Sequence, residues 1–207
     1  MHLLAFPMPD PGFELLIASH GTSQGVRQTD GIQVFPRAFV RIGDVQIGGQ
    51  WRNVSSPSAH GVAALFMKYR HIFRGGQIDA GMFYRIRTNA KEYRNSRAWE
   101  FSVSGRHSLG PLGLQVKADY SPKDFDQGKS VYVEIGPSFE IDKVTNLSGG
   151  VGRRERDRGP DYTSFNVGIS RTHQQKLILD ARYYQTNQGN LGPQYRGRLV
   201  FSIRLTL

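Results

Sequence analysis

The sequence predicts an all-β protein: a single antiparallel up-and-down transmembrane β-barrel with 12 strands, short periplasmic turns and longer extracellular loops. Apolar and polar residues alternate along most of the chain, which is the period of a strand with two different faces. Most of these segments are as long as the roughly 9–11 residues that a tilted strand needs to cross a bilayer. Tight and long connections also alternate, as they do on the two rims of an outer-membrane barrel.

The composition agrees with strands and excludes several kinds of site. The 207 residues include 24 Gly, 12 Phe, 2 Trp and 9 Tyr, which favour strands and turns over helices. The chain has no cysteine, so disulfides, thiolate zinc sites and cysteine nucleophiles are excluded. No apolar run is as long as a transmembrane helix, which needs roughly 18–20 residues.

The strands are predicted one by one from the alternation. In chain order they cover residues 12–20, 32–43, 45–55, 63–73, 77–89, 97–109, 113–121, 129–141, 144–156, 162–173, 176–187 and 194–207. Residues 1–11 are then a lead segment, and residues 12–207 form one barrel domain. Four strands show the alternation, and their apolar positions are Val45, Ile47, Gly49 and Trp51; Ile78, Ala80, Met82, Tyr84 and Ile86; Trp99, Phe101, Val103 and Gly105; and Leu199, Phe201, Ile203, Leu205 and Leu207.

Two strands alternate less cleanly. Strand 12–20 has apolar residues on both parities, and strand 144–156 carries Arg153 on the same parity as Leu147 and Val151. Pro36 and Pro137 each remove a ladder donor inside a strand. A bulge at either proline is left open.

The eleven connections fall into two classes that alternate along the chain. Tight and long connections on opposite rims place both termini on the periplasmic side of an even-stranded barrel. The tight ones are Gly43-Asp44, Arg74-Gly75-Gly76, Gly110-Pro111-Leu112, Asp142-Lys143 and Gln174-Gln175; the long ones are Gly21 to Gly31, Ser56 to Val62, Ala90 to Ser96, Pro122 to Gly128, Asp157 to Asp161, and Gln188 to Pro193.

Aromatic residues gather at one predicted rim. Amphipathic rings prefer the membrane–water interface, so aromatic side chains on the apolar parity near the long connections predict a girdle. Its members are Trp51, Tyr84, Trp99, Tyr120, Tyr183 and Tyr195. The opposite rim is less clear, with Phe73, His107 and Phe139 as candidates.

The polar parity is rich in arginine, and in a barrel this parity faces the lumen. The net charge is +10, and 20 of the 27 basic residues are Arg. A surplus of positive charge in the lumen favours the entry of anions. The predicted lumen residues are Arg37, Arg41, Arg52, Arg70, Arg85, Arg87, Arg106, Arg182, Arg198 and Arg204, with Asp79, Glu100, Asp119, Glu134 and Asp180; Lys68, Lys117 and Glu140 share their parity.

Barrel size leaves two lumen states open. About eight strands give a lumen filled by side chains, and about 16–18 give an aqueous channel. With twelve strands, the prediction is a narrow, Arg-lined diffusion channel for small anionic solutes, and the alternative is a structural barrel plugged by Arg–carboxylate pairs. The dense run from Arg153 to Arg158 is interpreted as a solvated loop end in preference to a phosphate site.

Ordered short motifs resemble the TorF-type porins of proteobacteria. The segment Gly25 to Gly31 is similar to the Gly-x-Ser-Gln-Thr-Asp-Gly region of that family. Further similarities, in the family's order, are Gln50-Trp51-Arg52-Asn53-Val54, Tyr120-Ser121-Pro122, Gly152-Arg153-Arg154-Glu155-Arg156, Pro160 to Asn166, and Leu179 to Tyr184. The resemblance implies a porin-like barrel in the outer membrane of a Gram-negative bacterium. It implies no particular solute and no binding residues.

Other classes explain less of the sequence. A lipid-acting enzyme at the membrane rim would use His20 with Thr22 or Ser23, but no third group that orients His20 is identifiable. A soluble calycin-like protein would line its interior with apolar residues instead of arginine. A nucleic-acid-binding module would account for the charge but not for the girdle or the alternating connections, so no nucleic acid is expected as a partner.

The remaining expectations concern the chain ends and the partners. Residues 1–11 lack the basic start of a signal peptide, which leaves open a mature form or a truncated start. Alternation continues to Leu207, as the closing strand of a barrel requires, and this strand is expected to engage the outer-membrane assembly machinery. The bilayer and lipopolysaccharide are the expected surroundings. No cofactor or metal is implied, and enzyme activity is not expected. The protein is expected to be a monomer.

Overall fold

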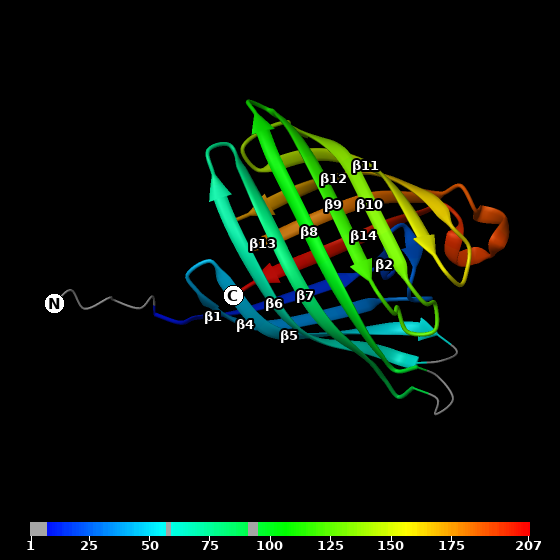
Figure 1. The fold of residues 1–207 in the computed structure, drawn as a ribbon. Coiled ribbons are helices and arrows are strands. Elements are labelled where there is room, and N and C mark those ends of the chain that lie inside the picture. The colour runs from blue at the N-terminus through cyan, green and yellow to red at the C-terminus, as the bar shows by residue number, and fades with distance from the viewer. Residues whose placement is uncertain (1–7, 57–58, 91–94) are drawn as a thin grey trace.

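A computed structural model describes residues 8–56, 59–90 and 95–207. Twelve long antiparallel strands close into one barrel, as predicted, in the order β1-β14-β13-β12-β11-β10-β9-β8-β7-β6-β5-β4 (Figure 1). The barrel strands are β1 (Asp10–Ala18), β4 (Gln33–Ile42), β5 (Val45–Ser56), β6 (Ala59–Phe73), β7 (Gly76–Thr88), β8 (Arg97–Leu109), β9 (Leu112–Ser121), β10 (Ser130–Glu140), β11 (Thr145–Arg156), β12 (Tyr162–His173), β13 (Leu177–Thr186) and β14 (Arg198–Thr206).

The first and last strands complete the closure. Leu15 of β1 lies opposite Leu205 of β14, and the backbone of Phe13 exchanges two hydrogen bonds with that of Leu207. The start of β1 and the end of β14 lie side by side at the end of the barrel that carries the tight turns. In one such turn, Gln174 and Gln175 both have positive φ, 48° and 59°, which is the twist that two-residue hairpins favour.

The outer surface is apolar over the length of the strands. Its side chains are 45% or more exposed at many positions, which in water would favour aggregation and in a bilayer forms a lipid-facing belt. Members of this belt include Ile47, Leu65, Val103, Val116, Val133, Ile135, Val151, Val167, Leu199, Phe201 and Ile203. Among the described residues, no helix is long and apolar enough to cross a membrane.

Four elements lie outside the barrel wall. The strands β2 (Thr22–Ser23) and β3 (Val26–Arg27) form a small hairpin in the connection after β1. Two short 3₁₀ helices, η1 (Gly189–Leu191) and η2 (Pro193–Tyr195), occupy the connection before β14. None of these was predicted.

Several predicted boundaries need correction. Strand β5 ends at Ser56 and strand β6 begins at Ala59, so residues 59–62, which were predicted as part of a long loop, belong to β6. Strand β14 begins at Arg198, because residues 193–195 turn as a 3₁₀ helix with proline in its first turn. Strand β1 includes Asp10 and Pro11, which were assigned to the lead segment; residues 1–7 lie outside the described residues.

The two prolines interrupt hydrogen bonding without shifting the strands. Pairing of β1 with β4 runs through Pro36 in constant register. Pairing of β10 with β11 skips Gly136 and Pro137 and resumes at Ser138 in the same register. The register shift that the pairings show lies instead between Asn53 and Ser56, where β5 meets β6.

Candidate functional site: the barrel lumen

Strand register defines which side chains face inward. Residues opposite each other on neighbouring strands point to the same face of the sheet. Starting from Arg37, one such row crosses the wall and ends at Ala98, passing Gln50, Ala64 and Arg85. The intervening parity carries the exposed apolar belt, so this row faces the lumen.

All fifteen predicted lumen residues lie on the inward parity. They divide by height in the barrel. Seven line a large cavity that runs from the long-loop end to about mid-strand: Arg37, Arg52, Arg85, Arg87, Arg204, Glu100 and Asp119. The others face inward outside this cavity: Arg41, Arg70, Arg106, Arg182, Asp79, Glu134 and Asp180, and Arg198 at the long-loop end.

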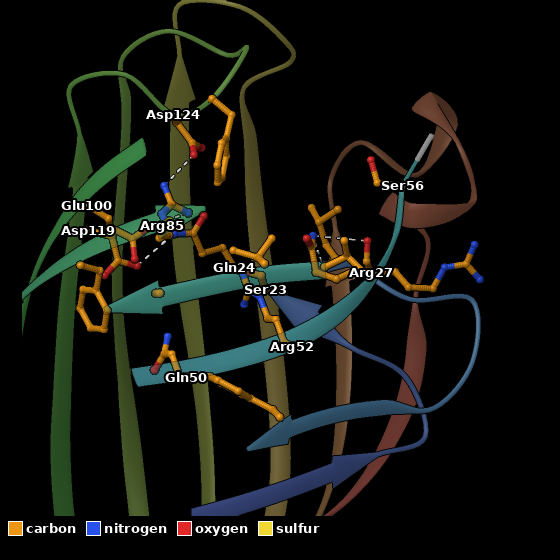
Figure 2. A pocket seen from close by; sticks show the side chains of 18 of the residues that line it. Ser23, Gln24, Arg27, Gln50, Arg52, Ser56, Arg85, Glu100, Asp119 and Asp124 are labelled. Carbon is orange, nitrogen blue, oxygen red and sulfur yellow. Dashed lines mark hydrogen bonds and ion pairs between the residues drawn. The ribbon is translucent and has the colours of Figure 1, made fainter. Parts of the chain in front are cut away.

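The cavity has a volume of about 940 Å³ (Figure 2). Among the described residues, its lining includes ten basic side chains and five acidic ones, so its net charge is strongly positive. The basic residues are Arg27, Arg37, Arg52, Lys68, Arg85, Arg87, Lys117, Arg154, Arg156 and Arg204; the acidic ones are Glu14, Asp30, Glu100, Asp119 and Asp124.

The connection after β1 folds into the lumen. Gln24 reaches across the barrel, and its Nε2 donates a hydrogen bond of 2.9 Å to Asp119 Oδ2 on β9 (Figure 2). Gly25 has φ +81°, and a Cβ at this position would lie 2.4 Å from Cβ of Ser164. The loop therefore touches both the β9 wall and the β12 wall, which narrows the lumen.

A threonine closes this inward loop at its base. Thr29 is 1% exposed, its Oγ1 accepts a hydrogen bond of 2.6 Å from Gly21 N, and the same hydroxyl donates one of 2.5 Å to Gly31 O. Asp30 N donates to Ser55 Oγ on β5 at 2.9 Å. The Gly25 to Gly31 motif therefore forms a fixed structural loop held against the wall.

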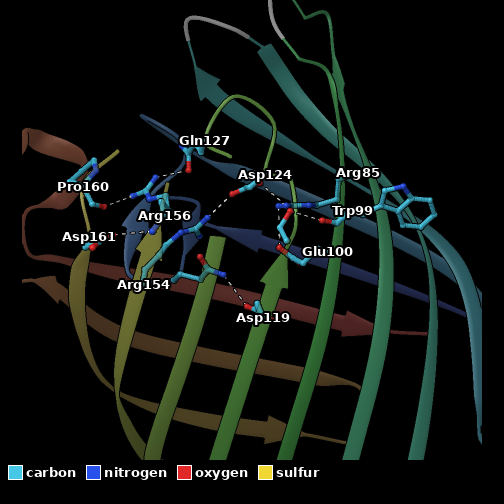
Figure 3. Close-up of polar contacts among 12 residues, drawn as sticks. Arg85, Trp99, Glu100, Asp119, Asp124, Gln127, Arg154, Arg156, Pro160 and Asp161 are labelled. Atoms are coloured by element: carbon cyan, nitrogen blue, oxygen red, sulfur yellow. Dashed lines mark hydrogen bonds and ion pairs between the residues drawn. The ribbon is translucent and has the colours of Figure 1, made fainter. Parts of the chain in front are cut away.

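The connection after β9 also folds inward. Asp124 Oδ1 accepts a hydrogen bond of 2.6 Å from Arg85 on β7, and Asp124 Oδ2 accepts one of 2.6 Å from Arg154 on β11 (Figure 3). Arg87 pairs with Asp126, and its guanidinium lies 4.4 Å from the ring centroid of the buried Phe125. One loop thus bridges two separated parts of the wall.

Pairing of the charges leaves a positive surplus in the cavity. Each of its five carboxylates takes part in an ion pair: Glu14 with Arg37, Asp30 with Arg27, Glu100 with Arg85, Asp119 with Lys117, and Asp124 with both Arg85 and Arg154. Arg156 is held by Gln127 Oε1 at 2.6 Å and by Pro160 O at 3.2 Å.

Three cations that line the cavity have neither a hydrogen bond nor an ion pair with any described residue. They are Arg52, Lys68 and Arg204, in contrast to the seven held by carboxylates, amides or carbonyls. Lys68 Nζ lies over the rings of Phe66 and Phe83, at 5.7 and 5.2 Å from their centroids. These three residues, called the free cations below, are the groups best able to meet a solute.

Toward the tight-turn end, the inward charges are largely paired. Arg70 Nε donates to Asp79 Oδ1 at 2.7 Å, and Arg182 lies 3.2 Å from Asp180. Arg106 is held by Gln77 Oε1 at 3.1 Å. This half of the lumen is closer to electrical balance than the cavity.

Two predicted site residues lie elsewhere than expected. Tyr195 is not on the outer surface: it is 7% exposed in η2, packs edge-on against Tyr162 at 5.6 Å and meets Arg156. Arg198 does not line the cavity, because its guanidinium donates to the carbonyls of Gly25, Gln194 and Arg196. Arg198 therefore joins the connection after β1 to the connection before β14.

The run from Arg153 to Arg158 also needs correction, because its first four residues belong to β11 and are not a solvated loop end. Arg154 and Arg156 point into the cavity, whereas Arg153 faces outward. The alternation of Gly150, Gly152 and Arg154 against Leu147 and Val151 was the signal that could have found them. Asp124 lies in a loop and gave no such signal.

The other five predicted girdle residues face outward near the long-loop end. Trp51, Trp99, Tyr120 and Tyr183 are 37%, 44%, 43% and 43% exposed, and Tyr84 packs against Trp99 with ring centroids 4.8 Å apart. At the other rim, Phe73 stacks on His107 at 6.1 Å. A membrane-interface role for these rings stays a prediction.

The proposed rim enzyme receives no support from the geometry. In the described part of the chain, no hydrogen bond joins His20 to Thr22 or Ser23, and His20 Nδ1 is buried without a partner. Thr22 Oγ1 instead lies 3.5 Å from Arg198 Nε.

Comparison with known proteins places the fold among porins. No family model matches the chain, and no curated protein matches its sequence. A KdgM porin aligns with TM-score 0.59 at 11% identity, covering 94% of this chain and 97% of that one. A NanC porin aligns with TM-score 0.58 at 8% identity, with coverage of 94% and 97%. A KdgM porin in complex with disordered oligogalacturonate gives 0.56 at 9%, with coverage of 94% and 96%.

This chain is therefore an outer-membrane-type β-barrel with the 12-strand fold of such porins. At these identities the likeness extends to the fold alone. The resemblance to TorF-type porins stays a prediction, since no family model matches.

Proposed function

We propose that the protein is a narrow diffusion channel in the outer membrane of a Gram-negative bacterium and that it prefers small anionic solutes. The observation that carries the proposal is the pattern of ion pairs in the 940 Å³ cavity. Among the described residues, every lining carboxylate is paired, whereas Arg52, Lys68 and Arg204 are the free cations. The cavity opens between loops at the long-loop end, which is the extracellular side in barrels of this class.

Unpaired positive charge in a confined lumen acts on solutes through its field. Low-dielectric walls focus the potential, which raises the local concentration of anions and lowers that of cations. The free cations lie on three strands, β5, β6 and β14, so more than one part of the cavity wall offers positive charge to an anion. Arginine and lysine that already hold a carboxylate contribute much less.

The neighbouring structures suggest one class of anion to test. The KdgM porin was described in complex with disordered oligogalacturonate, an acidic sugar chain. A short uronic-acid oligomer carries carboxylates that the free cations could hold in turn, so it is a useful probe beside chloride and phosphate.

A plugged structural barrel is the second candidate, and the two inward loops favour it. Gln24 reaches across the lumen to Asp119, and Asp124 joins Arg85 of β7 to Arg154 of β11 inside the lumen. If these loops leave no continuous path, the same ion pairs serve stability alone.

Single-channel recording in a planar bilayer distinguishes the two candidates. Refolded protein is measured under a tenfold KCl gradient, first at low and then at high salt. Discrete current steps with a reversal potential displaced toward that of chloride support the anion-selective channel. The preference for anions should weaken in about 1 M salt, where the screening length falls to about 3 Å. Insertion without conductance favours the plugged barrel, and a cation-sided potential contradicts the proposal.

A further inference from the structure

An apolar groove lies on the outer wall of the barrel, away from the lumen. It has a volume of about 370 Å³, is formed by β10 to β13, and is lined by Ile135, Val151, Phe165, Val167 and Tyr183. These side chains belong to the lipid-facing belt and are 43–53% exposed. The groove is therefore continuous with the surface that meets the bilayer.

The groove exists because the wall lacks side chains where β10 meets β11. Gly149 has no side chain to fill the outer surface, and Pro137 on the facing strand cannot donate a ladder hydrogen bond. A Cβ on Gly136 would lie 1.8 Å from the carbonyl oxygen of Gly149, so the two backbones approach more closely than any other residue would allow. The gap at Gly149 therefore cannot be filled by a rotamer change at that position, and the five lining side chains surround it.

A basic side chain stands beyond the groove toward the long-loop rim. Arg153 follows Val151 on the outward face of β11, and its side chain is 49% exposed. Its ion contacts are long, 3.5 Å to Glu155 and 3.8 Å to Asp161, and such exposed pairs contribute little. The guanidinium is therefore available to an anionic group at the membrane surface.

We propose that this groove binds one fatty acyl chain of a membrane lipid whose head group carries a net negative charge and contacts Arg153. A lipid chain is flexible and narrow enough to enter the groove, and it is present at high concentration on this face. A second copy of the barrel would present a convex wall that cannot enter a concave groove. The site is independent of whether the lumen conducts.

Native mass spectrometry of the protein in mild detergent tests the proposal with two synthetic lipids. Dipalmitoyl phosphatidylglycerol should bind one per barrel, at several-fold higher occupancy than dipalmitoyl phosphatidylcholine, which has the same chains and no net charge. Val167→Phe fills the groove and should reduce bound phosphatidylglycerol at least fivefold. Arg153→Gln should remove the preference for phosphatidylglycerol and leave chain binding in place.

Val103→Phe is the matched control. Val103 faces outward on β8, has the same 53% exposure as Val167 and lies outside the groove, so this variant should bind lipid as the wild type does. If Val167→Phe does not fold, Ile135→Phe fills the groove from β10. Equal lipid retention by the filled and control variants would overturn the proposal, as would a wild type that carries no lipid or that forms dimers through this face. Equal binding of the two lipids would overturn the role of Arg153.

Discussion

The carboxylate of Asp124 lies 2.6 Å from the guanidinium of Arg85, although Asp124 belongs to a loop after β9 and Arg85 to β7. The other oxygen of the same carboxylate meets Arg154 on β11 at the same distance. All three side chains are 8–12% exposed. One loop residue therefore ties two parts of the barrel wall together inside the lumen.

Asp124→Asn should destabilise the barrel and open it. The substitution leaves the buried guanidinium of Arg154 without its counter-charge and leaves Arg85 with Glu100 alone, a loss of about 3 kcal/mol. Release of the loop should also raise conductance and anion preference. Urea unfolding of the detergent-solubilised protein and single-channel recording measure the two effects.

Asp44→Asn makes the same chemical change on an exposed tight turn, where the described residues give the Asp44 side chain no partner. The control should unfold at the wild-type urea concentration. An Asp124→Asn protein with the same midpoint and conductance as the control would show that the loop does not hold the lumen.

Neutralising the free cations should weaken anion preference. The triple variant Arg52→Gln, Lys68→Gln and Arg204→Gln removes the charges that have no internal partner, so the reversal potential under a KCl gradient should move toward zero by more than half. A triple variant of three charges outside the lumen, Arg153→Gln, Arg171→Gln and Lys176→Gln, has the same change in net charge and should keep the potential. Equal effects of the two triples would place the selectivity elsewhere.

The strands were predictable because the bilayer imposes a strict requirement. A strand with lipid on one side and a wet lumen on the other must alternate, and this is why strand 97–109 is predicted with its observed ends. The inward parity of the fifteen lumen residues follows from the same period. Arg154 and Arg156 also lie on the inward parity of their strand. Their place in the lumen was missed because Arg153, on the apolar parity, interrupts the alternation.

The cavity itself was not predictable, because loops shape it. Nothing in the period of the chain indicates that Gln24 crosses to Asp119, or that Asp124 joins β7 to β11. Tyr195 was misplaced because its position continues the parity of β14, whereas Pro193–Tyr195 turn inward as η2. Contacts between loops and a distant wall depend on tertiary geometry, which local patterns do not encode.

Thr29→Val should loosen the loop after β1. The variant keeps the shape of the side chain but leaves Gly21 N and Gly31 O without the hydroxyl, at a cost of about 2 kcal/mol. Hydrogen exchange of residues 19–32 should accelerate. Thr172→Val is the control, since the hydroxyl of Thr172 makes no hydrogen bond within the described chain; exchange that is unchanged in both variants would refute the closing role of Thr29.

The two tryptophans should lie at the membrane interface. Trp51 and Trp99 are the only Trp residues in the sequence, and both face outward near the long-loop end. In vesicles, their fluorescence should be quenched more strongly by lipids brominated near the head group than by lipids brominated near the chain end. Stronger quenching by the lipids brominated near the chain end would show that the two tryptophans lie in the bilayer core and would contradict the predicted girdle.

The turn between β10 and β11 should show a small pH dependence. Asp142 Oδ1 accepts hydrogen bonds from Val144 N at 2.8 Å and from Thr145 N at 2.7 Å, and these bonds hold the pKa of Asp142 below its usual value. Because the folded pKa is the lower one, the stabilisation is present above the unfolded pKa, about 3.9 for an aspartate, and is lost as the pH falls through the folded pKa. Asp142→Asn keeps an acceptor oxygen without the titration, so its urea midpoint should fall less than that of the wild type between about pH 5 and pH 2. Parallel pH profiles for the two proteins would show that the turn does not contribute.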